Sequence, residues 1–392
     1  MKIAIVGCGY VAEYYAATLA NHPQLELAGA FDLLPDRATV FSRRNHCRAY
    51  ASMAELLADS EVSVVVNLTN PRSHRDINRA ALESGKHVYS EKPIAMTADD
   101  ARELAELAAS RGLHLAAAPC SVLSETAQTL WKAVRDGMIG RVRIAYATFD
   151  DGMIAPHMAP WSWKNDSGVP WPAKDEFEVG CTYQHAGYVL TWLTAMFGPA
   201  VRMSSFASCQ IPDKGIPVDR MAPDFTVGGI EYASGVVARV TCGLVAPRDK
   251  SIMVVGDEGV LWVTNVRDDA APVFLRRPGG STFSRVTSRV RPLRKWLSER
   301  LPPATLELLE SRKVPMLRPR EGRVALAEKP VDFCRGIADL VDAVATGRAP
   351  RLSAGLAAHT LEIVERLQYP ERFTDDRLRS TCDAMAPMPW AQ

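Results

Sequence analysis

The chain has 392 residues, of which 47% are hydrophobic and 23% charged, and its formal net charge at pH 7 is +1. A chain of this length can bury two hydrophobic cores, and its near-neutral charge excludes a general attraction to nucleic acid or to an anionic membrane. The eight cysteines show no Cys-x-x-Cys pair and no metal-ligand spacing, so we expect reduced thiols in a cytoplasmic protein without a metal site. A strand starting at Lys2 leaves no room for a signal peptide, and we expect no membrane span.

The first predicted element is a short buried strand over residues 3–6, and a glycine turn follows it at once. The turn has the pattern G-x-G-x-x-A, in which the first glycine permits the tight turn and the second lets the backbone approach a pyrophosphate. The small last residue lets the next helix pack against the strand, and the free N–H groups of that helix favour an anion. The residues predicted to hold the phosphates of a dinucleotide are Gly7, Gly9, Tyr10, Val11 and Ala12.

The second predicted strand, residues 25–31, ends at Asp32, about 20 residues past the glycines, where a ribose-binding carboxylate belongs. This carboxylate can accept hydrogen bonds from a ribose 2′-hydroxyl but repels a 2′-phosphate, so it favours NAD(H) over NADP(H). Arg37 and the pair Arg43-Arg44 keep NADP(H) open, because a guanidinium can neutralise that phosphate.

The alternation of strands and helices continues through strands predicted over residues 62–68, 87–90 and 113–118. This alternation predicts a parallel, doubly wound sheet that ends near Pro119. Ligands of such a sheet bind at the carboxyl ends of its strands. The residues predicted to lie at two of these ends are Thr69, Asn70, Glu91 and Lys92.

Lys92 is the most informative of these residues. Pro93 restricts the Lys92 backbone to an extended conformation, which fixes the direction of the side chain. A lysine in this place can lie beside a nicotinamide ring and stabilise a developing alkoxide. The alternative is a surface lysine in a turn.

Beyond Pro119 the predicted strands are short and joined by tight turns, which indicates antiparallel pairing. A basic, proline-rich segment near residues 276–330 interrupts this pattern. It is interpreted either as a solvated insertion or as a lid or subunit contact that attracts an anionic substrate. The predicted strands cover residues 141–149, 201–211, 225–232, 236–245, 251–255 and 260–264.

Taken in order, these segments resemble the Gfo/Idh/MocA family, the relatives of glucose-fructose oxidoreductase and inositol dehydrogenase. The resemblance implies an α/β fold: a Rossmann domain over residues 1–119, then an α/β domain over 120–392 with an open, mainly antiparallel sheet. It also implies hydride exchange between a nicotinamide and a carbinol carbon of a sugar, sugar nucleotide or cyclitol. His74 joins the expected cofactor-contacting residues. The matching stretches are residues 7–12, 32, 69–74, 81–88, 91–93, 136–140, 163–164, 230–240 and 332–367.

In this family a helix of the second domain commonly carries Asp and His four positions apart. Aligning the helix predicted over residues 182–197 on its Gly198 end places Gln184 and Tyr188 at those positions, on one helix face. Gln184 cannot act as a carboxylate, but tyrosine resembles the glucose-fructose oxidoreductase branch. We predict that Tyr188 carries the proton, because the alignment to Gly198 contains no gap and Gln184 then shares its face. An adjacent ammonium, that of Lys92, would favour the phenolate. His185 is the competing proton carrier, or a structural histidine.

Residues 150–175 interleave aromatic, proline and polar residues, as a loop that stacks on sugar C–H faces would. Trp161, Trp163, Lys164 and His185 are the predicted substrate-binding residues, and Trp163-Lys164 matches a Trp-Arg position of the family. The alternative is that these tryptophans pack the seam between two domains.

Three functions remain open from the sequence. The first is an NAD(H)-dependent oxidoreductase acting on a sugar or cyclitol. The second is elimination or glycoside cleavage through a transient keto intermediate. The third is a non-catalytic nucleotide sensor, suggested by the missing Asp at position 184. The exposed face of an open sheet indicates a homodimer or homotetramer.

Overall fold

The protein is seen in a computed structural model that describes residues 1–154, 158–277, 289–301, 305, 309–317 and 330–392. Its N-terminal part is a parallel sheet in the order β3-β2-β1-β4-β5-β6. The order reverses direction between β1 and β4, which is where ligands of doubly wound sheets bind. The predicted Rossmann sheet is confirmed. Its strands are β1 (Lys2–Val6), β2 (Glu26–Phe31), β3 (Arg48–Ala49), β4 (Val64–Asn67), β5 (His87–Ser90) and β6 (Leu115–Ala117).

The helices of this sheet begin where the local sequence supplies a cap. The hydroxyl of Ser52 accepts a hydrogen bond from the N–H of Glu55, and Thr97 does the same for Asp100. Pro71 occupies the first turn of its helix, where a missing N–H costs nothing. The helices are α1 (Ala12–Leu19), α2 (Pro35–Arg44), α3 (Met53–Ala58), α4 (Pro71–Glu83) and α5 (Ala98–Ser110).

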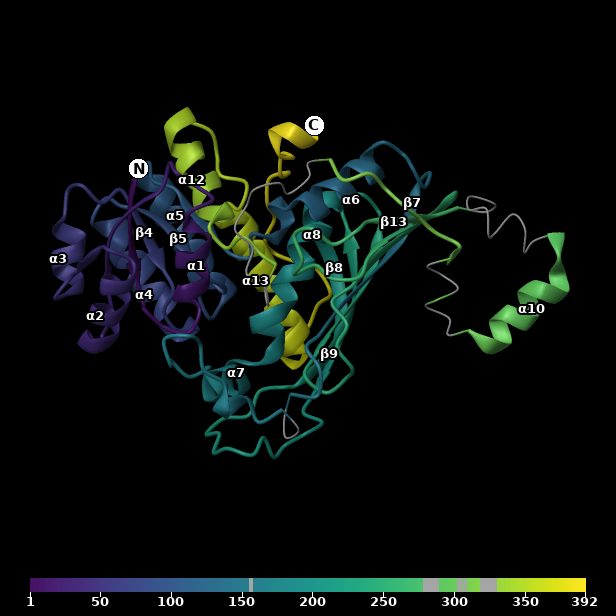
Figure 1. The fold of residues 1–392 in the computed structure, drawn as a ribbon, viewed down its shortest axis with the longest axis horizontal. Coiled ribbons are helices and arrows are strands. Elements are labelled where there is room, and N and C mark those ends of the chain that lie inside the picture. The colour runs from purple at the N-terminus through teal and green to yellow at the C-terminus, as the bar shows by residue number, and fades with distance from the viewer. Residues whose placement is uncertain (155–157, 278–288, 302–304, 306–308, 318–329) are drawn as a thin grey trace.

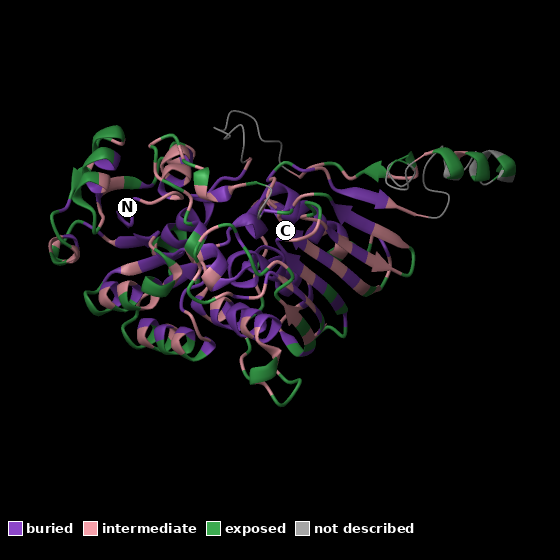
Figure 2. Cartoon of the chain, turned by 90° about the horizontal axis from the view of Figure 1, so that it is seen from below, coloured by how far each residue is buried: buried purple, intermediate pink, exposed green. Residues whose placement is uncertain are grey.

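The second part is an open sheet in the order β14-β13-β12-β11-β7-β10-β9-β8. All its pairs are antiparallel except β7 with β10, so the predicted mainly antiparallel sheet is confirmed. Buried residues alternate with more exposed ones along the strands (Figure 2), as expected when one sheet face meets a core. The strands are β7 (Val142–Asp150), β8 (Ala200–Ser208), β9 (Phe225–Tyr232), β10 (Val237–Gly243), β11 (Ile252–Gly256), β12 (Gly259–Val263), β13 (Phe274–Arg276) and β14 (Arg312–Lys313).

The C-terminal helices return to the first sheet and lie between the two sheets (Figure 1). α12 contacts β5 and β6, while α13 contacts α5 and β6 on one side and β8 on the other. The division into a Rossmann part and a later part is therefore bridged by the end of the chain. The helices of the later part are α6 (Glu125–Arg135), α7 (Ala173–Val179), α8 (Gly187–Phe197), α12 (Arg335–Thr346) and α13 (Ala354–Gln368).

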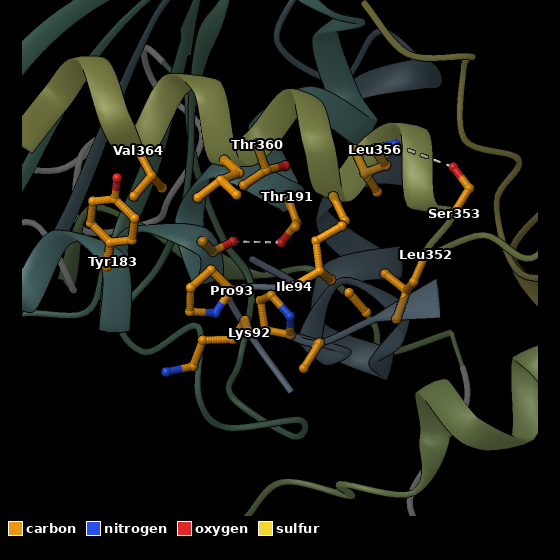
Figure 3. A pocket seen from close by; sticks show the side chains of 16 residues that line it. Lys92, Pro93, Ile94, Tyr183, Thr191, Leu352, Ser353, Leu356, Thr360 and Val364 are labelled. Atoms are coloured by element: carbon orange, nitrogen blue, oxygen red, sulfur yellow. Dashed lines mark hydrogen bonds between the residues drawn. The ribbon is translucent and has the colours of Figure 1, made fainter. Parts of the chain in front are cut away.

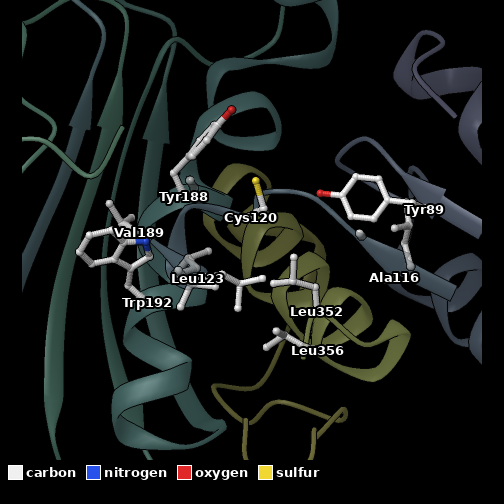
Figure 4. Close-up of a cluster of buried hydrophobic side chains, with 14 of the residues drawn as sticks. Tyr89, Ala116, Cys120, Leu123, Tyr188, Val189, Trp192, Leu352 and Leu356 are labelled. Atoms are coloured by element: carbon white, nitrogen blue, oxygen red, sulfur yellow. The ribbon is translucent and has the colours of Figure 1, made fainter. Parts of the chain in front are cut away.

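An apolar cluster fills the seam between these layers (Figure 4). Tyr89 comes from the first sheet, Leu352 and Leu356 from the α13 segment, and Trp192 from α8. Trp192 is buried and its indole N–H donates to Ser121 Oγ over 3.0 Å. Each large side chain buried here contributes roughly 1.5–3 kcal/mol. The seam holds the two sheets in one relative position, and the groups that face each other across it gain a fixed geometry.

The basic segment near residues 276–330 is described only in part. Within it, α10 (Arg291–Arg300) lies away from the rest of the protein (Figure 1). Residues 278–288, 302–304, 306–308 and 318–329 are outside the described residues, so the predicted lid or subunit contact falls largely there. No helix in the described part of the chain is both long and apolar enough to cross a membrane.

Candidate functional site

A cavity of about 370 Å³ lies where the carboxyl ends of the first sheet face the later part of the chain. Its two walls come from residues far apart in the sequence. One wall consists of Gly9, Tyr10, Val11, Tyr14, Arg37, Thr69, Asn70, His74, Glu91 and Lys92. The other consists of Trp171, Glu176, Gln184, His185, Tyr188 and Arg267.

The glycine turn has the shape that a dinucleotide needs. Gly7 has φ +96°, and a Cβ added there would lie 2.8 Å from the carbonyl carbon of Leu68, so a side chain is excluded. At Gly9 an added Cβ would meet no atom within 4 Å, because that face opens to the cavity. The turn therefore leaves room for a pyrophosphate against its backbone, as the sequence predicts.

Asp32 lies beside this turn and also holds it in place. One carboxylate oxygen accepts the N–H of Cys8 and the other accepts the N–H of Leu34, each over 2.8 Å. Each oxygen keeps a further lone pair for a ribose hydroxyl. Arg37 lines the cavity, whereas Arg44 pairs with Glu13 over 3.1 Å. Of the basic residues that leave NADP(H) open, Arg37 is thus the one placed at the cavity.

His74 fixes the loops at two strand ends. Its Nδ1 lies 2.6 Å from the carbonyl oxygen of Pro93, and its Nε2 lies 2.8 Å from that of Thr69. Burial lowers the pKa of His74, so the ring is neutral and donates to one of the two. The Thr69 hydroxyl in turn donates to Asn67 Oδ1 over 2.7 Å. His74 lines the cavity and also links the loop after β4 to the loop that carries Lys92.

Glu91 and Lys92 take different roles. The carboxylate of Glu91 accepts the hydroxyl of Tyr15 over 2.7 Å and the N–H of Lys92 over 3.0 Å. The Lys92 ammonium donates to Gln184 Oε1 over 3.0 Å and lies 5.9 Å from the centre of the Tyr188 ring. Burial lowers the pKa of Lys92, and the carboxyl groups nearby oppose that shift. Lys92 therefore joins the two walls of the cavity.

The backbone of Lys92 borders a mainly apolar pocket (Figure 3). Pro93 and Ile94 face Leu356 and Thr360 of α13 in this pocket, and the Lys92 side chain points away from it. The direction that Pro93 was expected to impose is thus supported by α13.

The helix predicted over residues 182–197 is not uniformly α-helical. Thr182–Ala186 form a π-helical turn before α8 begins, so the prediction is wrong in its first turn. A π turn is wound more loosely than an α turn and shifts the direction of successive side chains. As a result Gln184, His185 and Tyr188 all line the same cavity.

His185 belongs to a buried cluster that includes a residue not predicted from the sequence. Its Nε2 lies 3.2 Å from Glu176 Oε1, and its ring stacks on Phe149 with centres 5.0 Å apart. Burial raises the pKa of Glu176 to about 8 and lowers the pKa of His185 to about 3, so both are neutral at pH 7. His185 Nδ1 is buried and has no hydrogen-bond partner. A buried nitrogen without a hydrogen-bond partner lowers the stability of the protein unless a ligand supplies that partner.

Tyr188 is held as a neutral phenol. Its ring stacks on Phe149 with centres 5.2 Å apart, and the Arg267 guanidinium lies 4.8 Å from the ring centre. Burial raises the pKa of Tyr188 to about 12, which the positive charge of Arg267 only partly offsets. Positive charge beside the ring lowers the pKa in the expected direction, but its effect is smaller than that of burial. Desolvation outweighs the attraction, and Tyr188 can donate a hydrogen bond.

A second cavity of about 300 Å³ adjoins the first and shares Tyr10, Trp171, His185 and Arg267 with it. Trp163 lines this second cavity, as expected for a substrate-binding residue. Trp161 instead lies against Gly215, and Lys164 is exposed; neither lines the two cavities. Their predicted contact with substrate stays a prediction.

Comparison with known proteins agrees with this geometry. Residues 1–118 match the model of the oxidoreductase family with an NAD-binding Rossmann fold, and residues 127–262 match the GFO/IDH/MocA C-terminal domain. Trans-1,2-dihydrobenzene-1,2-diol dehydrogenase of Mus musculus is 28% identical over 334 residues, covering 79% of this chain and 93% of its own.

Two solved structures share the fold. Aldose-aldose oxidoreductase of Caulobacter crescentus is 18% identical and superposes with a TM-score of 0.73 over 95% of this chain and 97% of its own. Levoglucosan dehydrogenase in complex with NADH is also 18% identical, with a TM-score of 0.73 over 94% and 95%. The two family models together match more than half of the chain, so this protein belongs to the GFO/IDH/MocA family of NAD(P)-binding oxidoreductases.

Proposed function

We propose that this protein exchanges hydride between NAD(H) and a carbinol carbon of a sugar, a sugar nucleotide or a cyclitol. The observation that carries the proposal is the position of the Lys92 ammonium, which faces Gln184 from the later part of the chain within the larger cavity. This is where a carbinol oxygen would need a positive charge as it becomes an alkoxide. Aldose-aldose oxidoreductase and levoglucosan dehydrogenase are named for sugar substrates and the dihydrobenzenediol dehydrogenase for a cyclic diol, which supports a carbinol substrate.

The cofactor would lie along the wall formed by the first sheet. Its phosphates would contact the backbone of residues 7–12, and its ribose hydroxyls would donate hydrogen bonds to the Asp32 carboxylate. When bound, NAD supplies the acceptor for the hydride. We propose NAD(H) over NADP(H) because the Asp32 carboxylate repels a 2′-phosphate, although Arg37 lines the same cavity.

We propose that His185 moves the hydroxyl proton, with Glu176 as its positioning residue. His185 Nδ1 and Glu176 Oε1 are both buried without a hydrogen-bond partner, although Glu176 Oε1 lies 3.2 Å from His185 Nε2. A neutral imidazole that turns its Nε2–H to Glu176 presents Nδ1 as the proton acceptor. Tyr188, a neutral phenol, would donate a hydrogen bond to the carbinol oxygen and so orient it. Tyr188 is the alternative proton carrier.

The test is turnover of a polyol panel with NAD, followed by NADH absorbance and by product analysis. Formation of one NADH for each carbinol oxidised supports the proposal. Consumption of carbinol without NADH would instead support elimination through a transient keto intermediate. Binding of NADH without turnover of any carbinol or ketone would support the nucleotide-sensor alternative. Membership in an oxidoreductase family disfavours that alternative.

We also propose a cytoplasmic homodimer or homotetramer. All eight cysteines are free, as expected in a reducing compartment. On the open sheet Val201, Phe206 and Val237 are large hydrophobic residues with 42%, 60% and 42% of their surface exposed. A second subunit would cover such side chains. Light scattering after gel filtration would measure the mass, and a monomer at micromolar concentration would contradict this proposal.

A further inference from the structure

Charged side chains lie together where neighbouring strands of the second sheet begin or end, beside the proposed reaction site. Asp151 directly follows β7, Lys250 precedes β11, and Arg267 follows β12. These three strands are neighbours in the order β12-β11-β7 and alternate in direction. The end of β7, the start of β11 and the end of β12 therefore lie side by side. Arg248 lies there as well, and all four residues line the second cavity of about 300 Å³.

The charges in this cavity do not balance. Among its described lining residues, three cations face one carboxylate, which leaves an excess of two positive charges. Lys250 donates to Asp151, and Arg248 approaches the same carboxylate at 3.9 Å. Burial opposes ionisation of Asp151, but its polar and positively charged neighbours hold the pKa of that carboxyl below its usual value. Asp151 is therefore an anion, and it already forms an ion pair with Lys250.

Arg267 is the cation of this cavity that the Asp151 carboxylate does not pair with. Among the described residues, no carboxylate lies within ion-pairing distance of its guanidinium, which contacts the face of the Tyr188 ring instead. A partly buried guanidinium without a counter-charge is unfavourable unless a ligand supplies one. The planar guanidinium suits two parallel hydrogen bonds to a carboxylate or a phosphate.

The second cavity opens onto the reaction site through shared residues. Arg267 and His185 line both cavities, and the Tyr188 ring is close to both Arg267 and Lys92. The guanidinium and the ammonium are 4.8 and 5.9 Å from the centre of that one ring. A small acidic sugar can thus place its carbinol at Lys92 and its anionic group at Arg267. The indoles of Trp163 and Trp171 provide the remaining walls.

We infer that the second cavity is a subsite for an anionic oxygen group, a carboxylate or a phosphate, on the substrate. Arg267 binds this group directly, and Lys250 and Arg248 add positive charge around it. The inference deepens the proposed function and rests on it: the carbinol substrate is a sugar acid or a sugar phosphate rather than a neutral sugar.

The experiment is calorimetric titration of the NADH-loaded protein with D-glucose, D-glucuronate and D-glucose 6-phosphate, and with D-galactose and D-galacturonate. At least one anionic probe should bind about tenfold or more tightly than its neutral counterpart, the scale of one charged hydrogen bond. The stronger of the carboxylate and phosphate probes identifies the group. Added KCl should weaken anionic binding more than neutral binding.

Arg267→Gln should abolish the preference for the anionic probe while leaving NADH affinity within about twofold. Arg239→Gln is the matched control, because Arg239 also lies over a tyrosine ring, that of Tyr146 at 4.7 Å, but lines neither cavity. This control should keep the preference.

Three results would overturn the inference: equal binding of neutral and anionic probes, no binding of any probe, or a preference that survives in Arg267→Gln. Loss of NADH binding in that variant would also overturn it, because the guanidinium would then serve the cofactor. The proposed function fails separately. A protein that selects the anionic probe through Arg267 but never changes the redox state of NAD keeps the subsite and loses the oxidoreductase reaction.

Discussion

The two walls of the larger cavity are built in different ways. The cofactor wall begins at a glycine turn of backbone and small residues, Gly7 and Gly9, beside which two backbone N–H groups hold the Asp32 carboxylate, and it ends at Glu91 and Lys92. The substrate wall consists of titratable side chains, and burial shifts the pKa of Glu176 and Tyr188 upward. The first wall is fixed by steric fit and the second by desolvation and charge.

This difference determines how each wall should respond to mutation. Changes on the cofactor wall should alter binding by small factors, because many backbone contacts remain. Changes on the substrate wall should alter turnover by large factors, because each charged group acts in a partly dry cavity where electrostatic interactions are strong. The following variants test that contrast.

Lys92 is the exception on the cofactor wall, because its ammonium donates to Gln184 of the substrate wall, and Lys92→Ala should have the largest effect. It removes the cation that meets the developing alkoxide, so kcat should fall by roughly 100-fold or more while the affinity for NADH stays largely intact. Steady-state kinetics and a fluorescence titration with NADH measure the two quantities. Lys174→Ala is the control, since this lysine pairs with Asp219 on the surface. Unchanged turnover in Lys92→Ala would remove the residue from the mechanism.

His185→Asn should cost roughly 100-fold in kcat, and Tyr188→Phe roughly 10-fold, if the imidazole carries the proton and the phenol only orients the oxygen. Single-turnover rates of NADH formation compare them. Tyr183→Phe is the matched control, because its hydroxyl, from the same π turn, donates to the carbonyl oxygen of Met96. A larger loss in Tyr188→Phe than in His185→Asn would exchange the two roles and restore the assignment favoured by the sequence alone.

The cofactor wall could be predicted from the sequence, and the substrate wall only in part. The glycine turn and Lys92 follow local patterns that need no knowledge of the rest of the fold. Glu176 and Arg267 are single charged residues in ordinary surroundings, and only the order of β7, β11 and β12 and the position of α7 bring them to the cavity. The π turn was missed because it covers only Thr182–Ala186, and five residues are too few for its different spacing to appear in the apolar pattern.

Glu176→Gln should change how stability depends on pH. Burial raises the pKa of this carboxyl to about 8, above the ordinary 4.5 of the unfolded chain. Between these values the folded protein keeps a proton that the unfolded chain has released, so stability falls as pH rises. The variant lacks this penalty and should gain on the order of a few kcal/mol relative to the parent between about pH 5 and 8. Urea unfolding of the cofactor-free protein measures the free energy of unfolding at each pH. If this free energy depends on pH in the same way in parent and variant, Glu176 is ionised in the folded protein.

Asp32→Ala should have the smallest effect, on the cofactor wall. The carboxylate accepts the N–H groups of Cys8 and Leu34, so its loss loosens the turn and weakens both NADH and NADPH. Only the ratio of the two affinities reports on the ribose, and we expect the preference for NADH to fall by on the order of 1 kcal/mol. Calorimetry with each cofactor measures that ratio. Asp36→Ala is the control, because Asp36 lines a neighbouring cavity with Arg37. Should Asp36→Ala remove the preference and Asp32→Ala leave it unchanged, the discriminating carboxylate is the one on α2, and the role of Asp32 is to hold the turn.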